Sequence, residues 1–240
     1  MDPSLPVMQC VILAGGRGTR LGELTASLPK AMVDVNGRPF LEYEIDLLRS
    51  HGIVNIVLCV GHLADAIQRH FGDGSQHGVT IRYSIERGAL LGTAGAVKQA
   101  EPLLNEVFFL TYADSYLRMN YQAALGRFRG GGEPAMMVVL QNENRFERSN
   151  LVVKDGYVLV YDKLHGHPGM NYINFGVCLL RREALARIPP NEAYSQEQWF
   201  QQFIDEGRLA AFETGDRFYE IGSPDGLEEF RRLVAAGELP

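Results

Sequence analysis

The sequence has little that would suit it to an oxidising compartment or to binding a polyanion. Among its 240 residues only three are cysteines, far apart and each inside an apolar run, at Cys10, Cys59 and Cys178. Such cysteines are predicted to be buried free thiols in strands, without a disulfide framework or metal-like spacing. Acidic residues outnumber basic ones, 29 to 23. This balance argues against a nucleic-acid partner and leaves room for a small anionic ligand in a locally basic site.

The sequence also lacks long apolar runs. No stretch is long enough to span a membrane, and residues 1–4 have neither the positive region nor the apolar core of a signal peptide. We therefore expect a cytoplasmic protein with no membrane partner. No Ser/His/Asp or Cys/His arrangement suggests nucleophilic catalysis. His165 and His167 lie in a Gly/Pro-rich stretch without further ligands, which favours a surface loop over a metal site.

The first half of the chain alternates strand and helix patterns, which indicates βαβ crossovers and a mostly parallel sheet. The strands are predicted at Gln9–Leu13, Asn55–Val60, Val79–Ser84 and Val107–Thr111, and the helices at Phe40–His51, His62–Phe71 and Thr93–Glu101.

The second half changes character. Asp155-Gly156 is a strong hairpin signal, and it lies between the predicted strands Leu151–Lys154 and Tyr157–Asp162. A further strand is predicted at Tyr172–Leu180, with helices at Arg182–Ile188, Ser195–Glu206 and Pro224–Ala236. We therefore expect an α/β fold with helices on both faces of the central sheet and an antiparallel C-terminal addition.

A glycine-rich turn follows the first strand. Gly15, Gly16 and Gly18 let backbone N–H groups approach an anion closely, although glycines alone suit an ordinary tight turn equally well. The dinucleotide fingerprint would need a glycine where Leu21 stands, and the Gly-Lys-Ser/Thr of a P-loop is absent. Two cations, Arg20 and Lys30, come after the turn, as the binding of a triphosphate requires.

The predicted topology places a carboxylate beside this turn. If the strand order is 3-2-1-4, the ligand edge lies where the strands ending at Leu13 and Thr111 are neighbours. Asp114 follows the second of these strands. A carboxylate beside phosphates is a natural Mg²⁺ ligand, and the alternative is a helix or turn cap.

These residues resemble those of the sugar-1-phosphate nucleotidyltransferases over nearly the whole chain. The specific signature runs from Gly15 through Pro29-Lys30-Ala31-Met32 to Gly37-Arg38-Pro39, and the compact length is similar to the bacterial heptose-, mannose- and N-acetylmuramate-1-phosphate branch. The resemblance implies a Rossmann-like fold and one domain over residues 1–240, with a nucleotide-binding half at 1–130 and a sugar-binding half at 131–240.

The resemblance also implies site residues. The expected catalytic groups are Arg20 on the leaving pyrophosphate, Lys30 on the phosphates, Lys163 on the sugar phosphate, and Asp114. Asp114 and Glu220 are the expected Mg²⁺ ligands, although the family usually has aspartate at the second position. The expected substrate contacts are Leu13, Gly15, Gly16, Gly18, Thr19 and Glu86, then Gly92 and Thr93 in the nucleoside turn, and Asn174 and Glu197 at the sugar hydroxyls.

The substrates implied are an NTP and a sugar 1-phosphate, bound by a monomer or small homo-oligomer. Glu86 could accept hydrogen bonds from guanine, which favours GTP with heptose 1-phosphate or mannose 1-phosphate. The alternatives are UTP with an N-acetylmuramate or N-acetylglucosamine 1-phosphate, CTP with an alcohol phosphate such as phosphocholine, and a non-catalytic nucleotide-sugar sensor.

Overall fold

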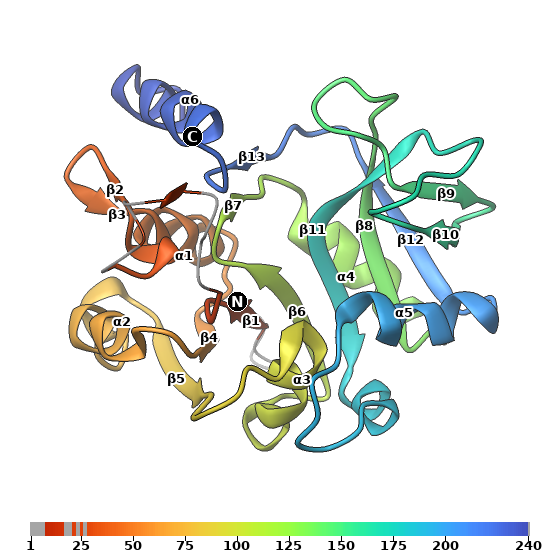
Figure 1. The fold of residues 1–240 in the computed structure, drawn as a ribbon, viewed down its shortest axis with the longest axis horizontal. Coiled ribbons are helices and arrows are strands. Elements are labelled where there is room, and N and C mark those ends of the chain that lie inside the picture. The colour runs from red at the N-terminus through yellow and green to blue at the C-terminus, as the bar shows by residue number, and fades with distance from the viewer. Residues whose placement is uncertain (1–7, 17–20, 23–24, 26–27, 240) are drawn as a thin grey trace. The chain divides into compact units, whose positions relative to one another are not determined.

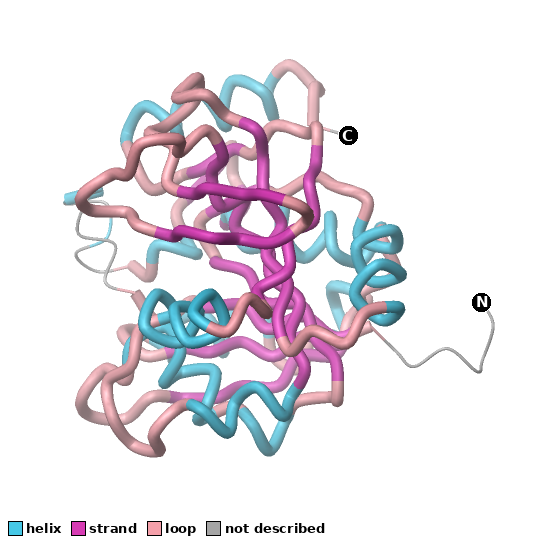
Figure 2. The backbone as a smooth tube through the Cα atoms, turned by 90° about the vertical axis from the view of Figure 1, so that its right-hand side faces the viewer, coloured by secondary structure: helices cyan, strands magenta, loops and turns pink. Residues whose placement is uncertain are grey.

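The computed structural model describes residues 8–16, 21–22, 25 and 28–239, and it divides into two compact units. The first unit takes its described residues from Met1–Leu90, Thr111–Tyr116 and Phe218–Pro240, and the second consists of Leu91–Leu110 and Leu117–Arg217. The elements of both are labelled in Figure 1, and their helices and strands can be followed in Figure 2. The division into halves at residue 130 stays a prediction.

Three parallel strands form the sheet of the first unit: β1 (Gln9–Leu13), β4 (Asn55–Val60) and β5 (Thr80–Ile85), in the order β5-β4-β1. The apolar side chains of β1 and β4 are almost wholly buried, as expected for parallel strands covered on both faces, whereas those of β5 are partly exposed. The backbone N–H of Ala113 donates to the carbonyl of Leu13 at 3.1 Å, which places the end of the fourth predicted strand next to β1. The predicted order 3-2-1-4 is thus confirmed at this edge.

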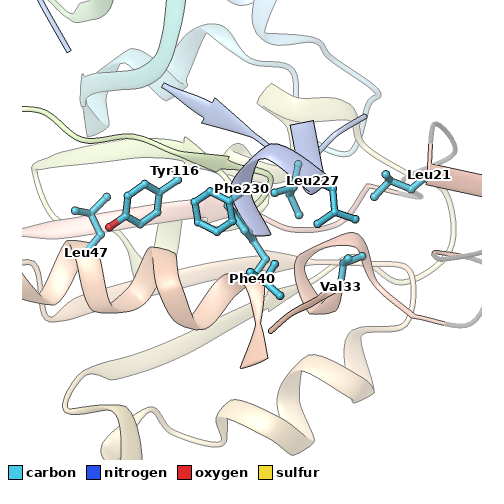
Figure 3. Close-up of a cluster of buried hydrophobic side chains, with 9 residues drawn as sticks. Leu21, Val33, Phe40, Leu47, Tyr116, Leu227 and Phe230 are labelled. Carbon is cyan, nitrogen blue, oxygen red and sulfur yellow. The ribbon is translucent and has the colours of Figure 1, made fainter. Parts of the chain in front are cut away.

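A second apolar cluster in the first unit joins segments that are distant in sequence (Figure 3). Phe230 packs on Phe40 with ring centroids 5.1 Å apart and on Tyr116 at 5.3 Å. All three side chains are at most 3% exposed. The remaining elements of this unit are η2 (Lys30–Met32), β2 (Asp34–Val35), β3 (Arg38–Pro39), α1 (Phe40–Ser50), α2 (Ala64–Phe71), η3 (Ser75–His77), β7 (Ser115–Tyr116), β13 (Tyr219–Glu220) and α6 (Pro224–Ala235).

The second unit is built on a mixed sheet. From β6 (Val107–Tyr112), whose first four residues lie in this unit, the strand order is β6-β11-β8-β12-β10-β9. Strand β11 is antiparallel to β6 and β8, and β12 is parallel to β8. The elements are α3 (Gly92–Gln99), η4 (Glu101–Leu103), α4 (Tyr121–Gly130), β8 (Ala135–Gln141), β9 (Leu151–Lys154), β10 (Tyr157–Tyr161), β11 (Tyr172–Arg181), η5 (Arg182–Arg187), α5 (Gln196–Asp205) and β12 (Leu209–Thr214).

The antiparallel C-terminal addition is confirmed, including the hairpin at Asp155-Gly156, where both residues have positive φ. Strands β8 and β12 and helix α4 were not predicted. The helix predicted at Arg182–Ile188 is present as a 3₁₀ helix over Arg182–Arg187. All three cysteines are buried and free, as predicted. Within the described ranges, no helix combines the length and apolar character needed to cross a bilayer.

Candidate active site

The glycine-rich turn begins where β1 ends. Ala14 N–H donates to the Cys59 carbonyl at 2.8 Å, which holds the start of the turn against β4. A Cβ at Gly15 would lie 2.8 Å from Oε2 of Glu86, whereas a Cβ at Gly16 would meet nothing within 4 Å. The Glu86 carboxylate therefore lies directly against Gly15, and a side chain at this position would displace it. The structure thus brings together three predicted residues, Gly15, Gly16 and Glu86.

Lys30 and Asp114 form an ion pair in the same unit. Lys30 Nζ lies 2.6 Å from Asp114 Oδ2, and the two side chains are 13% and 29% exposed. Lys30 opens a 3₁₀ turn in which the N–H of Val33 donates to its carbonyl at 3.1 Å. Asp114 follows Ala113, whose N–H is bonded to Leu13, so the ion pair is anchored at the end of β1. Lys30 is therefore a mostly buried side chain with a carboxylate partner and not an ordinary surface lysine.

Glu220 comes next to Asp114 through a short antiparallel pairing. Strands β7 and β13 align Ser115 with Glu220, and Ile221 N–H donates to the Asp114 carbonyl at 2.9 Å. The Glu220 carboxylate accepts hydrogen bonds from Gly222 N–H and the Ser223 hydroxyl. Glu220 therefore organises the turn into α6 in addition to its predicted role at a metal.

The donor set at this place suits a hard divalent cation. It contains the carboxylate of Glu220 on β13 and that of Asp114, the residue directly before β7, and Asp114 already faces the Lys30 ammonium. Mg²⁺ prefers oxygen ligands and shares them with substrate phosphates. Each carboxylate oxygen retains a lone pair beyond the hydrogen bonds given above. Asp114 and Glu220 therefore fit the predicted ion.

The second unit carries a separate polar cluster around Lys163. Its Nζ lies 2.8 Å from Glu197 Oε1 and 5.4 Å from the ring centroid of Tyr161. Asn174 Nδ2 donates to the Tyr161 hydroxyl at 3.1 Å. The structure therefore brings the three predicted sugar-side residues, Lys163, Asn174 and Glu197, around one buried tyrosine.

The charges of this cluster support one another. Burial disfavours the ammonium of Lys163, but Tyr161 and Glu197 outweigh it and raise the pKa of this lysine. Burial likewise opposes the Glu197 carboxylate, and the hydrogen bond and charge of Lys163 hold its pKa below the ordinary value. Both groups are therefore charged at neutral pH, and Lys163 offers a fixed cation.

Gly92 and Thr93 are held at the start of α3. Gly92 has φ +71°, and a Cβ there would lie 2.8 Å from the Tyr194 carbonyl oxygen. The Thr93 hydroxyl accepts from Gln196 N–H at 2.8 Å, and Tyr194 N–H donates to the Leu91 carbonyl. The predicted nucleoside turn is thus fastened to the segment that leads into α5.

Three predicted residues, Gly18, Thr19 and Arg20, lie outside the residues that the structure describes. The sequence analysis missed two groups that shape the site. One is Tyr161, two residues before Lys163 and on the same side of an extended chain, a spacing that could have indicated it. The other is Ser115, whose hydroxyl donates to Asp114 Oδ1 at 3.1 Å. His165 and His167 are exposed, in agreement with a surface loop.

Comparison with known proteins places these residues in a family. A D-glycero-alpha-D-manno-heptose 1-phosphate guanylyltransferase of Campylobacter jejuni is 30% identical over 93% of this chain and 98% of its own length. A UTP–glucose-1-phosphate uridylyltransferase of Synechocystis is 29% identical over 95% of the chain, which spans 64% of that protein.

Two solved structures are similar over nearly the whole chain. HddC of Yersinia pseudotuberculosis superposes with a TM-score of 0.79 at 27% identity, over 95% of this chain and 99% of that one. A second structure of HddC, in complex with GMP-PN, has a TM-score of 0.78 at 26% identity over 95% and 99% of the two chains. The family model described as nucleotidyl transferase matches residues 9–235. The chain therefore belongs to the nucleotidyl transferase family, as its signature residues predicted.

Proposed function

We propose that this protein is a sugar-1-phosphate nucleotidyltransferase that transfers GMP from GTP to a manno-configured sugar 1-phosphate. The acceptor is D-glycero-D-manno-heptose 1-phosphate or mannose 1-phosphate, and the products are a GDP-sugar and pyrophosphate. The observation that carries the reaction type is the Lys30–Asp114 pair at the end of β1, beside the glycine-rich turn. The relatives that act on heptose 1-phosphate support the choice of sugar.

Glu86 supports the choice of base. Its carboxylate lies against Gly15, at the predicted phosphate turn. A carboxylate accepts hydrogen bonds only, and guanine presents two neighbouring donors, the N1–H and the amino group. Uracil presents a single N–H donor. A carboxylate at this place therefore favours GTP over UTP.

The reaction is an in-line displacement at the α-phosphorus. An oxygen of the sugar 1-phosphate forms the new O–P bond while the bond to the β-phosphate oxygen breaks, and pyrophosphate leaves with that electron pair. A phosphate monoester is largely dianionic at neutral pH, since its second pKa is about 6, so no general base is needed. Catalysis then depends on position and charge.

This chain's own residues supply those charges. Lys30 stabilises the charge that develops on the phosphates, and Lys163 holds the sugar phosphate. Arg20, outside the described residues, is assigned to the leaving pyrophosphate. A divalent metal ion belongs to the chemistry of this family, and we assign Mg²⁺ to Asp114 and Glu220. When bound, the ion supplies charge neutralisation at the phosphates.

A pyrophosphate-release assay over four NTPs and several sugar 1-phosphates tests the proposal. We expect GTP with heptose or mannose 1-phosphate to give the highest kcat/KM. Glu86→Gln should reduce the preference for GTP over UTP, because the amide replaces an acceptor by a donor. UTP turned over at least about tenfold better than GTP, a difference of about 1.4 kcal/mol, would contradict the assigned base.

Transfer of UMP to an N-acetylmuramate or N-acetylglucosamine 1-phosphate is the second candidate, and the uridylyltransferase among the relatives favours a uridine nucleotide. The same assay decides between the two. A non-catalytic sensor would bind nucleotide sugars and release no pyrophosphate with any pair. The charged Lys30, Asp114 and Lys163 argue against a sensor, since a protein that only binds would not need this set.

A further inference from the structure

Three metal-ligating side chains of the first unit gather away from the residues of the proposed reaction. Glu42 comes from α1, His70 from α2 and His77 from η3. Each offers one ligand atom, and these atoms all lie within 4.8 Å of one another. Within the described part of the chain, this is the one group of at least three His, Cys, Asp or Glu residues with such spacing. Two imidazoles and a carboxylate, each from a different element, therefore lie close enough to bind one ion.

The Glu42 carboxylate is positioned by hydrogen bonds to both of its oxygens. Glu42 Oε2 accepts from Arg38 Nε at 2.8 Å, while Oε1 lies 2.6 Å from His70 Nε2. One oxygen of Glu42 is thus held by Arg38, and the other faces His70. Such outer partners are typical of metal ligands because they orient the ligand atom.

The imidazole rings of His70 and His77 both pack against the ring of Phe71. The ring of Phe71, 2% exposed, lies with its centroid 4.7 Å from that of His70 and 5.0 Å from that of His77. The turn carrying His77 begins at Gly74, which has φ +84° and leaves no room for a Cβ against Val79. His77 N–H donates to the Gly74 carbonyl at 2.9 Å. Both histidines are therefore positioned by packing and backbone geometry.

We propose that Glu42, His70 and His77 bind one Zn²⁺ ion. Two imidazole nitrogens and one carboxylate oxygen are a donor set that suits zinc and not Mg²⁺. Three protein ligands leave a fourth position for water. Zinc–ligand bonds of about 2.0–2.2 Å put the ligands of a tetrahedral ion roughly 3.3–3.6 Å from one another. Glu42 Oε1 and His70 Nε2, now 2.6 Å apart, therefore separate slightly around the ion, and all three ligand atoms already lie within 4.8 Å of one another. The Zn²⁺ replaces the direct hydrogen bond between Glu42 Oε1 and His70 Nε2, and Arg38 continues to donate to Glu42 Oε2.

The surrounding charges permit a cation. Arg38 and Arg49 lie nearby, the latter beside Gly78, and both donate to Asp46, at 2.7 and 3.0 Å. Their positive charge is therefore partly neutralised. The ligands join α1, α2 and η3, so that zinc would fasten these elements to one another. The ion has no part in nucleotidyl transfer.

The test is calorimetric titration of the chelator-treated full chain with ZnCl₂ in excess Mg²⁺, which saturates oxygen-only sites. We expect one Zn²⁺ per chain, and at least about tenfold weaker binding in His70→Gln, His77→Gln and Glu42→Gln. His167→Gln is the matched control, a histidine in an exposed loop, and should bind as the unaltered chain does. Co²⁺ in place of Zn²⁺ should give a visible absorption band that His77→Gln abolishes.

The proposal is overturned by several results. These are absence of binding, binding that all three variants retain, or binding that His167→Gln removes. His77 lies in a surface turn, so its replacement keeps the test decisive even if Glu42→Gln perturbs α1. Circular dichroism of each variant shows whether the fold is kept. None of these outcomes depends on the transferase activity.

Discussion

At the scale of single residues, Lys30 carries the most specific expectation. It is mostly buried and paired with Asp114 at 2.6 Å. Because it acts through charge that develops in the transition state, Lys30→Ala should lower kcat by about 10²-fold while the fold is kept. Steady-state pyrophosphate release measures this. Lys154→Ala removes an exposed lysine at the end of β9 and should leave kcat unchanged. A Lys30→Ala enzyme with near-normal kcat would mean that the lysine only stabilises Asp114.

The two carboxylates should respond differently. Asp114→Asn removes a charge that the metal needs and is expected to abolish turnover, whereas Glu220→Gln should reduce it less completely, because the longer arm can act through a bridging water. Activity as a function of Mg²⁺ concentration measures both. Glu220 also accepts from Ser223, so Ser223→Ala is the control that keeps the carboxylate and loses this hydrogen bond, together with the N-cap bond from Gly226 N–H. Equal losses in Ser223→Ala and Glu220→Gln would assign Glu220 to the turn and not to the metal.

Glu44 gives a pH-dependent expectation. The carboxyl is 3% exposed, and its Oε1 accepts from Thr111 at 3.1 Å. Burial raises its pKa well above the ordinary value, Thr111 opposes this, and the charge of Asp114 adds to it. As pH rises past the unfolded pKa of about 4.3, the unfolded chain loses this proton before the folded chain does. The free energy of unfolding therefore falls with rising pH.

Glu44→Gln has no proton to lose, so its stability relative to the unaltered chain should improve between about pH 5 and pH 8. Urea unfolding at both pH values measures the difference. Comparing the two pH values cancels the direct cost of the amide. A stability difference that is independent of pH would show that Glu44 is not neutral in the folded state.

At the scale of elements, the start of α3 offers a matched pair of glycines. Gly92 and Gly156 both have positive φ, +71° and +79°, but only Gly92 has backbone, the Tyr194 carbonyl, where a Cβ would go. Each alanine variant should lose about 1 kcal/mol or more through backbone strain. Gly92→Ala should lose more, because the Tyr194 segment must also shift. Thermal unfolding compares them, and equal losses would mean that the segment leading into α5 moves freely.

Several elements could be predicted because their signals are local. The apolar runs at Gln9–Leu13 and Asn55–Val60 match β1 and β4, and the helix predicted at Thr93–Glu101, ended by Pro102, extends two residues beyond the end of α3 at Gln99. The hairpin at Asp155-Gly156 followed from two residues alone. Strands β8 and β12 were not predicted, although Ala135–Leu140 of β8 is a continuous apolar run; what no short-range pattern reports is their parallel pairing, which joins segments more than sixty residues apart.

The candidate site was predictable in part for the same reason. Lys30, Asp114 and Lys163 were found from signature residues, whereas their partners are decided by tertiary structure. The hydrogen bonds from Ser115 to Asp114 and from Asn174 to Tyr161 depend on side-chain positions that only the structure gives, although the spacing of Tyr161 and Lys163 could have indicated the tyrosine. The hydrogen bond from the Ser223 hydroxyl to Glu220 likewise depends on the start of α6, where Ser223 is the N-cap. A sequence motif therefore indicates the charged side chains of a site more readily than the hydroxyl groups that orient them.

At the scale of the whole molecule, the first unit depends on the last part of the chain. Phe230 and Leu227 of α6 are fully or almost fully buried against Phe40 and Tyr116 (Figure 3). Ending the chain after Arg217 removes α6 and should expose the rings of Phe40 and Tyr116. The remaining segments of the first unit should then become sensitive to protease, while Leu117–Arg217 stays resistant. Limited proteolysis with mass spectrometry measures this. A truncated chain as resistant as the full one would show that α6 contributes little.

The three-part construction of that unit has a consequence for biosynthesis. A ribosome delivers β1, α1 and β4 early, but α6 emerges only after the entire second unit has been made. At the usual rate of about 5–20 residues per second, the first unit waits roughly ten seconds with the Phe40 face uncovered. During this interval the nascent chain presents the kind of apolar surface that chaperones bind. The second unit begins only after the first ninety residues of the first unit have been made. It is nevertheless completed first, because the first unit still lacks Phe218–Pro240.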